Sequence, residues 1–199
     1  RFLSAQMTGI VLGQAAGCLI GDHFGWRTVY LIIGALHVVA GLAMLVELHA
    51  NPAAQPPKAP AVQGFAGFLG GLGAILGRRW VRIMLLAVFA ESFAMYGAFA
   101  YIGADLRHRF GLSFSMIGIV MSVYGGGAIL YSLTARRMLA RLGERGFVLS
   151  GGVLLAAGFT GLALARDVWL VPPLMALLGL AFYLIHNTLQ TNATQMAPE

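Results

Sequence analysis

GIVLGQAAGCLIGDHFGW, residues 9–26, carries a glycine at every fourth position: Gly9, Gly13, Gly17 and Gly21. In water, each glycine inside a helix costs about 1 kcal/mol relative to alanine. In lipid, helices gain little from burying apolar side chains against one another, and small residues let two backbones approach closely. Gln14 beside the stripe adds an amide that needs a hydrogen-bond partner. The stripe, with Gln14, therefore predicts a helix-packing motif inside a membrane.

The composition of the 199-residue chain is that of a membrane protein. Hydrophobic residues make up 59% of the chain, charged residues make up 10%, and the mean hydropathy is +0.81. A soluble domain has about 25% charged residues. The net charge of +6 does not indicate nucleic acid binding, because the basic residues lie in short clusters between apolar runs. The single cysteine, Cys18, is interpreted as a small packing residue, and we expect no metal or other cofactor.

Six apolar stretches are long enough to cross a bilayer, at about 3–21, 28–48, 81–104, 114–135, 147–165 and 169–191. An even number of spans places Arg1 and Glu199 on one side of the membrane. The segments on that side carry nine basic residues and those on the other side carry four. By the positive-inside rule, this predicts that both ends and the long connection are cytoplasmic. The first and last residues resemble positions inside a longer sequence, so we expect the chain to be a fragment of a longer protein.

Residues 49–80 separate two predicted spans from four. Within this connection, NPAAQPPKAPA (51–61) is rich in proline and alanine and predicts an extended linker. The following FAGFLGGLGAILGRRW (65–80) is apolar, crowded with glycine and too short to span comfortably. It predicts an interfacial segment that leads into the third span.

Glu91 lies about nine residues past Arg82, near the middle of the predicted third span. A carboxylate at the bilayer centre costs roughly 2.5 to 3.5 kcal/mol or more unless it faces water or a partner. Our hypothesis is that Glu91 faces a cavity and couples proton movement to substrate movement, or binds a cationic group. The alternative is a neutral acid that locks two helices together. Tyr96 and Tyr101 follow on the same helix and are candidates for lining the same cavity.

His186, Asn187 and Gln190 cluster near the cytoplasmic end of the last predicted span, with His186 and Gln190 one helical turn apart. They are candidates for substrate contact, although polar residues are also tolerated near the membrane interface. His37 is alone among apolar residues in the second span. We interpret it as a neutral hydrogen-bonding group between helices.

Two motifs resemble the major facilitator superfamily, specifically its twelve-helix drug:proton antiporters. Gly9, Gly13 and Gly17 match the GxxxGPxxGG stripe of the fifth helix, with Gln14 in place of proline and Cys18 in place of the last glycine. The turn that follows matches at Gly25, Trp26 and Arg27.

The second motif, RRMLARLGERG (136–146), resembles the GxLADRxGRR loop of the same family. Arg141, Gly143 and Arg145 match, whereas Arg136 replaces the first glycine and Ala140 the acidic residue. The resemblance implies a cytoplasmic gating loop that includes Arg136 and Arg137. The alternative is a solvated turn whose arginines only set the topology.

The resemblance covers the whole chain and implies an all-α integral membrane fold, a fragment holding helices five to ten. Residues 1–48 would be the last two helices of the N-terminal bundle and residues 81–199 the first four of the C-terminal bundle. FYLIHNTLQTNATQMAPE (182–199) also resembles the tenth helix of bacterial efflux-type members.

The function that the resemblance implies is alternating-access transport in the bacterial inner membrane, by a protein that is a monomer when full length. We expect proton-coupled efflux of a small amphipathic or sugar-like molecule, with protons as the coupling ion. Proton-coupled uptake and a non-transporting helical bundle stay as alternatives. An intramembrane enzyme is disfavoured, because the sequence has no GxSG, HExxH or paired histidines.

Overall fold

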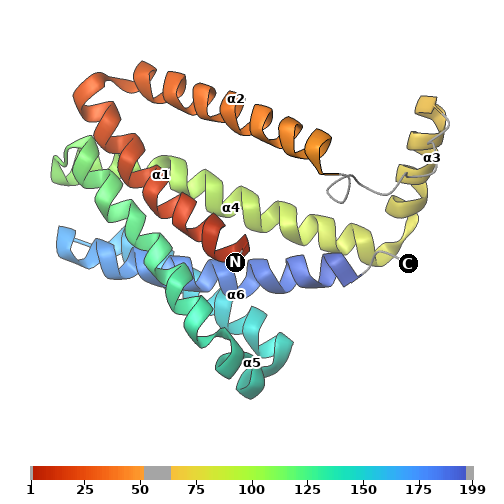
Figure 1. Cartoon of the computed structure of the whole chain (residues 1–199). Coiled ribbons are helices and arrows are strands. Elements are labelled where there is room, and N and C mark those ends of the chain that lie inside the picture. The colour runs from red at the N-terminus through yellow and green to blue at the C-terminus, as the bar shows by residue number, and fades with distance from the viewer. Residues whose placement is uncertain (1, 52–63, 196–199) are drawn as a thin grey trace.

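The computed structural model describes residues 2–51 and 64–195, and the regular elements in those ranges are helices (Figure 1). In chain order they are α1 (Phe2–Phe24), α2 (Trp26–Ala50), α3 (Gly64–Gly77), α4 (Arg79–Phe110), α5 (Phe114–Leu164), the 3-10 helix Val168–Leu170 and α6 (Val171–Gln195). This confirms the predicted all-α fold class. Most of the predicted linker, residues 52–63, lies outside the described residues, as does Arg1.

Four described helices are long and apolar enough to cross a membrane: α2, α4, α5 and the segment Val168–Asn192. The 51 residues of α5 would measure about 77 Å, against about 30 Å for the hydrocarbon core. Gly143, at φ 64° and ψ 175°, interrupts α5, which therefore consists of two arms. Each arm holds one predicted span. The remaining predicted span, residues 3–21, corresponds to α1, which is not among these four.

The connections sort the helix termini into two groups. We call the end that holds Gly25, Gly111 and residues 165–170 the loop end, because α1–α2, α4–α5 and α5–α6 connect there. Gly25 (φ 83°) and Gly111 (φ 65°) have positive φ angles, which glycine adopts without steric cost. We call the opposite end, where α2 stops and α4 starts, the linker end.

The core lies where α6 packs against α5. Val171, Met175, Leu178 and Leu184 of α6 are fully buried. Two glycines bring the backbones into contact. A Cβ added to Gly127 would lie 2.0 Å from the carbonyl oxygen of Ala176. A Cβ added to Gly179 would lie 1.9 Å from the carbonyl oxygen of Tyr124.

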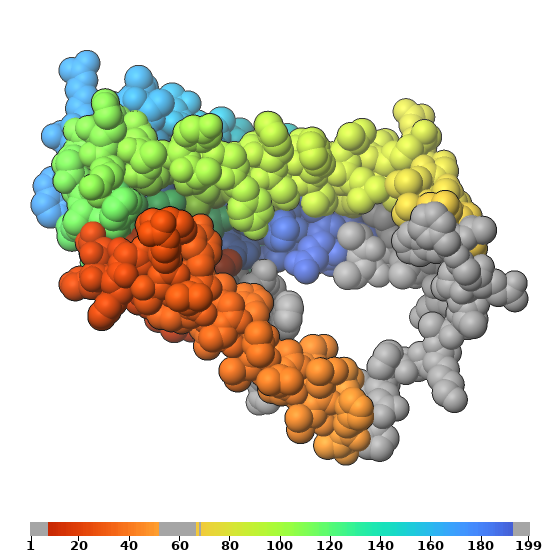
Figure 2. All heavy atoms as spheres, turned by 90° about the horizontal axis from the view of Figure 1, so that it is seen from above, coloured from red at the N-terminus to blue at the C-terminus, as the bar shows by residue number. Residues whose placement is uncertain are grey.

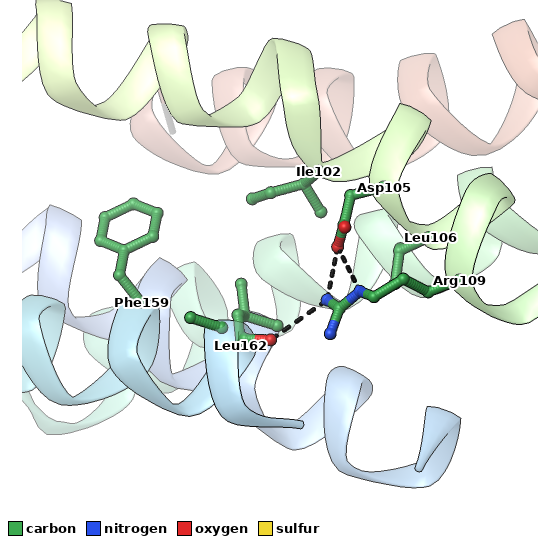
Figure 3. A pocket seen from close by; sticks show the side chains of 7 residues that line it. Ile102, Asp105, Leu106, Arg109, Phe159 and Leu162 are labelled. Carbon is green, nitrogen blue, oxygen red and sulfur yellow. Dashed lines mark hydrogen bonds and ion pairs between the residues drawn. The ribbon is translucent and has the colours of Figure 1, made fainter. Parts of the chain in front are cut away.

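Arg109 joins the loop end of α4 to the last turn of α5 (Figure 3). Its guanidinium pairs with Asp105, with Nε donating to Oδ2 at 2.8 Å, beside a surface cavity of about 320 Å³. It also donates to the carbonyl oxygens of Leu162 (3.1 Å) and Ala165 (3.0 Å). The last carbonyls of a helix lack partners within the helix, and a cation there complements the helix dipole. We therefore interpret this cavity as the edge of a structural contact.

α1 packs against the first arm of α5, while α2 lies on the outside with no buried residue (Figures 1 and 2). A Cβ on Gly118 would lie 2.3 Å from Cβ of Cys18, and a Cβ on Gly125 would lie 2.0 Å from Cγ2 of Val11. The contact between α1 and α5 is therefore close, and α5 supplies the glycines. This places a helix of the predicted N-terminal bundle directly against the predicted C-terminal bundle.

Candidate functional site

A cavity of about 370 Å³ lies among four helices, between α1 and the group α4, α5 and α6. Residues from all four helices line it: Gly9, Ile10, Gly13, Gln14, Met95, Tyr96, Phe99, Tyr124, Phe182, Tyr183 and His186. We call it the central cavity. Its volume is in the range of small-molecule sites.

Aromatic rings form most of the wall of the central cavity. The Phe99 and Tyr124 rings meet edge to face at 4.9 Å, and Phe182 lies 6.1 Å from Tyr124. The His186 ring stacks on Phe182 at 4.9 Å and 15°. Such a wall suits the flat face of an aromatic compound or of a sugar ring. Apart from His186, these residues were not predicted from the sequence, although Met95 and Phe99, and Phe182 and His186, are each one helical turn apart.

Glu91 of α4 and His186 of α6 meet at the edge of the central cavity. Nδ1 of His186 lies 3.3 Å from Oε2 of Glu91. The Glu91 side chain is 6% exposed and the His186 side chain 30% exposed, so the carboxyl is screened and the imidazole reaches the cavity. Glu91 lies 12 residues after the first residue of α4, about 18 Å along the helix. The contact with Glu91 therefore places His186 at the depth predicted for Glu91, and not nearer the cytoplasmic end of its span as the sequence predicted.

The net charge of the Glu91–His186 pair decides how costly it is to bury. Oε1 of Glu91 is buried and has no hydrogen-bond partner in the described part of the chain. With one proton, the pair is either a neutral acid facing a neutral imidazole or a carboxylate facing an imidazolium. With none or with two, it carries a net charge in a low-dielectric site, which is costly. The pair is therefore least costly to bury when it carries no net charge.

The other predicted polar residues are distributed unevenly around this pair. Tyr96 lines the central cavity although its side chain is largely exposed, whereas Tyr101 lines a shallow groove farther along α4. Asn187 follows His186, and its Nδ2 is buried without a hydrogen-bond partner among the described residues. Gln190 is exposed, one turn farther along α6. His37 is exposed and its Nδ1 contacts the Ile33 carbonyl of its own helix at 2.8 Å, so the interhelical bond expected for it is not present here.

The glycine stripe of α1 does not coincide with the closest helix contacts in the described structure. An added Cβ at Gly9 or Gly13 would meet nothing within 4 Å, and both glycines line the central cavity. Gly17 and Gly21 face Val29 of α2 at 3.9 and 3.6 Å, which is ordinary contact distance. Gln14 lines the cavity wall, and its Oε1 is buried without a hydrogen-bond partner among residues 2–51 and 64–195. The role of the stripe in packing against another helix stays a prediction.

The predicted gating loop lies at the kink between the two arms of α5. Gly143 carries the positive φ angle that turns the chain, which explains why glycine occupies this position. The side chains around it are exposed: Arg136, Arg137, Arg141 and Arg145. The exposure is compatible with both the gating and the topological interpretation.

A contact that we did not predict connects α1 to α5 at the loop end. Oδ2 of Asp22 accepts hydrogen bonds from the Ser115 hydroxyl (2.6 Å) and from its backbone N–H (3.1 Å). Together these bonds hold the pKa of the Asp22 carboxyl below its usual value. With the Cys18–Gly118 contact one turn away, they join the two helices at this end. The sequence feature that could have indicated this contact is the position of Asp22, an acidic residue just outside a predicted span.

Comparison with known proteins points to the same family as the two sequence motifs. The family model described as Major Facilitator Superfamily matches residues 1–199. A Bacillus subtilis (strain 168) protein named as the uncharacterized MFS-type transporter YceJ is 25% identical over 166 residues. The match covers 82% of this chain and 41% of that protein, so the chain spans well under two thirds of the relative's length. No solved structure matches the chain.

Proposed function

Because the chain belongs to the Major Facilitator Superfamily, we propose that it forms the middle part of a secondary transporter that exports a small molecule in exchange for protons. The observation that carries this proposal is the Glu91–His186 pair at the edge of the central cavity. A buried acid is expensive in a membrane and marks an ion or proton pathway by default.

In the proposed cycle, the pair takes a proton when the central cavity faces the outside and releases it when the cavity faces the cytoplasm. His186 lies between the buried Glu91 carboxyl and the cavity, so the imidazole is the group through which the proton reaches Glu91. Loss of the proton leaves a negative charge in the site, which favours entry of a substrate that carries hydrogen-bond donors or a positive charge. Return of the proton displaces that substrate.

Alternating access also needs contacts that close one side of the cavity. We propose that the loop end is outside and that Asp22–Ser115 is part of the outer closure. The nine-to-four distribution of basic residues supports this orientation, with the linker and both chain ends in the cytoplasm of a bacterial inner membrane. The arginines at the kink near Gly143 then lie on the cytoplasmic side, where a gating loop would act.

Asp22→Asn is expected to loosen the outer closure. The single cysteine, Cys18, lies at this contact, so the rate at which a membrane-impermeant maleimide labels it from outside reports opening. We expect severalfold faster labelling in Asp22→Asn than in the wild type, because a neutral amide accepts the two Ser115 bonds more weakly. Asp167→Asn, which changes an exposed acid at the same end, is the matched control.

The pH dependence of this contact has a definite sign. A carboxyl with a lowered folded-state pKa stabilises the contact above its usual pKa, near 3.9, and the stabilisation is lost as the pH falls through the lowered value. The ratio of labelling rates between Asp22→Asn and the wild type should therefore stay constant between about pH 5 and pH 8. A ratio near one, or one that changes across this range, would count against the outer closure.

Two alternatives make different demands on the same site. A proton-coupled importer would use the same pair with proton and substrate moving together. A non-transporting bundle would need the helix contacts and would have no use for an acid at the edge of a cavity. The central cavity and the pair favour transport over the bundle, and the direction of coupling is decided by experiment.

The test uses proteoliposomes that contain the full-length protein. Counterflow of labelled compounds first identifies a substrate, and its accumulation is then measured under a pH gradient of each sign. Antiport predicts accumulation when the lumen is acidic, whereas symport predicts it when the outside is acidic. Absence of counterflow with any compound would favour the non-transporting bundle.

A further inference from the structure

The short helix α3 differs from the other helices in length and direction. Its 14 residues contain no charged side chain and measure about 21 Å, less than the hydrocarbon thickness. In Figure 1 it runs across the direction of α2, α4 and α6, at the linker end where α4 begins. If α4 crosses the membrane, α3 lies along the membrane surface.

The surface of α3 is apolar. Leu69, Leu72, Ile75 and Leu76 are between 38% and 53% exposed, although they are among the largest apolar side chains of the helix. In water, this exposure would be unfavourable. At the boundary of the acyl chains, the same side chains enter the hydrocarbon while the helix stays parallel to the surface.

Basic and aromatic residues follow α3 directly. Arg78, Arg79 and Arg82 are exposed, and Arg78 turns the chain between α3 and α4 with an extended backbone. Trp80, in the middle of this cluster, is 55% exposed, as is usual for tryptophan at a membrane interface. The sequence from 48 to 90 contains no aspartate or glutamate. The positive charges in this part of the chain therefore have no acidic partner nearby in the sequence and complement negatively charged lipid phosphates.

We propose that α3, with Arg78, Arg79 and Arg82, is an anchor for anionic phospholipid at the cytoplasmic surface of the membrane. The leucine and isoleucine side chains enter the outer part of the acyl region, and the arginines bind headgroup phosphates. Charge complementarity and the direction of α3 favour lipid over a second copy of the chain. The anchor does not depend on proton coupling, so it can fail or hold independently of the proposed transport.

The depth of α3 is tested with the full-length protein in vesicles whose phospholipids carry bromine at a shallow or a deep acyl position. All native tryptophans are replaced by phenylalanine and Leu72→Trp provides the probe. We expect stronger quenching by shallow bromine. Phe89→Trp, at an exposed position near the middle of α4, is the control and should be quenched more strongly by deep bromine.

The lipid preference is tested separately with spin-labelled lipids. The wild type should prefer phosphatidylglycerol over phosphatidylcholine, and the triple variant Arg78→Gln, Arg79→Gln, Arg82→Gln should lose most of this preference, up to about fivefold per arginine. Arg107→Gln, at the loop end, should leave it unchanged.

Three outcomes would overturn the anchor. Leu72→Trp could be unquenched by either lipid, it could be quenched mainly by deep bromine, or its emission could depend on the protein-to-lipid ratio as contact with a second copy would require. An unchanged lipid preference in the triple variant would remove the role of the arginines.

Discussion

Glu91→Gln is expected to abolish proton-driven accumulation while exchange of substrate across the membrane continues. Glutamine has the same size as glutamate and keeps an oxygen that can accept a hydrogen bond from His186. Unlike glutamate, it cannot take up or release a proton. Exchange of one proton per substrate allows about tenfold accumulation per pH unit of gradient, since one unit is 1.36 kcal/mol. The variant should reach only equal concentrations on both sides.

The measurement is accumulation under a pH gradient and counterflow without one, in the same proteoliposomes. Glu47→Gln is the matched control, because Glu47 is an exposed acid near the linker end of α2. It should accumulate substrate as the wild type does. Driven accumulation by Glu91→Gln at the wild-type level would exclude Glu91 as the coupling residue, and loss of both activities would indicate the alternative in which the acid locks α4 to α6.

Gly127→Val should disrupt the packing of α5 against α6. The first added carbon atom would lie 2.0 Å from the Ala176 carbonyl oxygen and 2.5 Å from the Leu180 nitrogen. Both neighbours are helix backbone, which cannot move aside as a flexible side chain does. Overpacking of a core commonly costs 1–3 kcal/mol, and we expect at least about 3 kcal/mol here because α6 as a whole must shift.

Gly126 gives a direct comparison for this substitution. It is the preceding residue on the same helix, and an added Cβ there would meet nothing within 4 Å. Gly126→Ala should be neutral or stabilise the helix by up to about 1 kcal/mol, from helix propensity alone. Thermal unfolding in detergent measures both variants. Equal melting temperatures for Gly126→Ala and Gly127→Val would show that the close contact between α5 and α6 is not formed.

The sequence predicted properties that depend on one helix at a time. The kink of α5 falls at Gly143, within the predicted loop, and the mid-membrane depth of Glu91 stays a prediction from its distance to Arg82. Composition indicated a membrane protein, and the apolar spans with the family resemblance predicted that it is all-α. The predicted span at residues 3–21 likewise corresponds to one helix, α1.

Properties that depend on how one helix is rotated against another were harder to predict from the sequence. Glu91 and His186 are 95 residues apart, and both were candidates for separate reasons, but their contact depends on the register of α4 against α6. The glycines of α1 were visible as a stripe, whereas Gly118 and Gly125 of α5, which admit the closest contacts with α1, were not singled out. For the same reason, the sequence indicated only Tyr96 and His186 of the cavity wall, and Tyr124, Phe182 and Tyr183 were not singled out.

The central claim is that Glu91 and His186 hold a proton that can be exchanged. Infrared difference spectroscopy of the protein in lipid tests it directly, through the C=O stretch of a protonated carboxylic acid that is lost in Glu91→Gln. In the proposed cycle, substrate and proton exclude each other, so we predict that this band changes in intensity when substrate is added and shifts in frequency in His186→Ala. A Glu91 signal that does not change when substrate is added would contradict the proposed exchange.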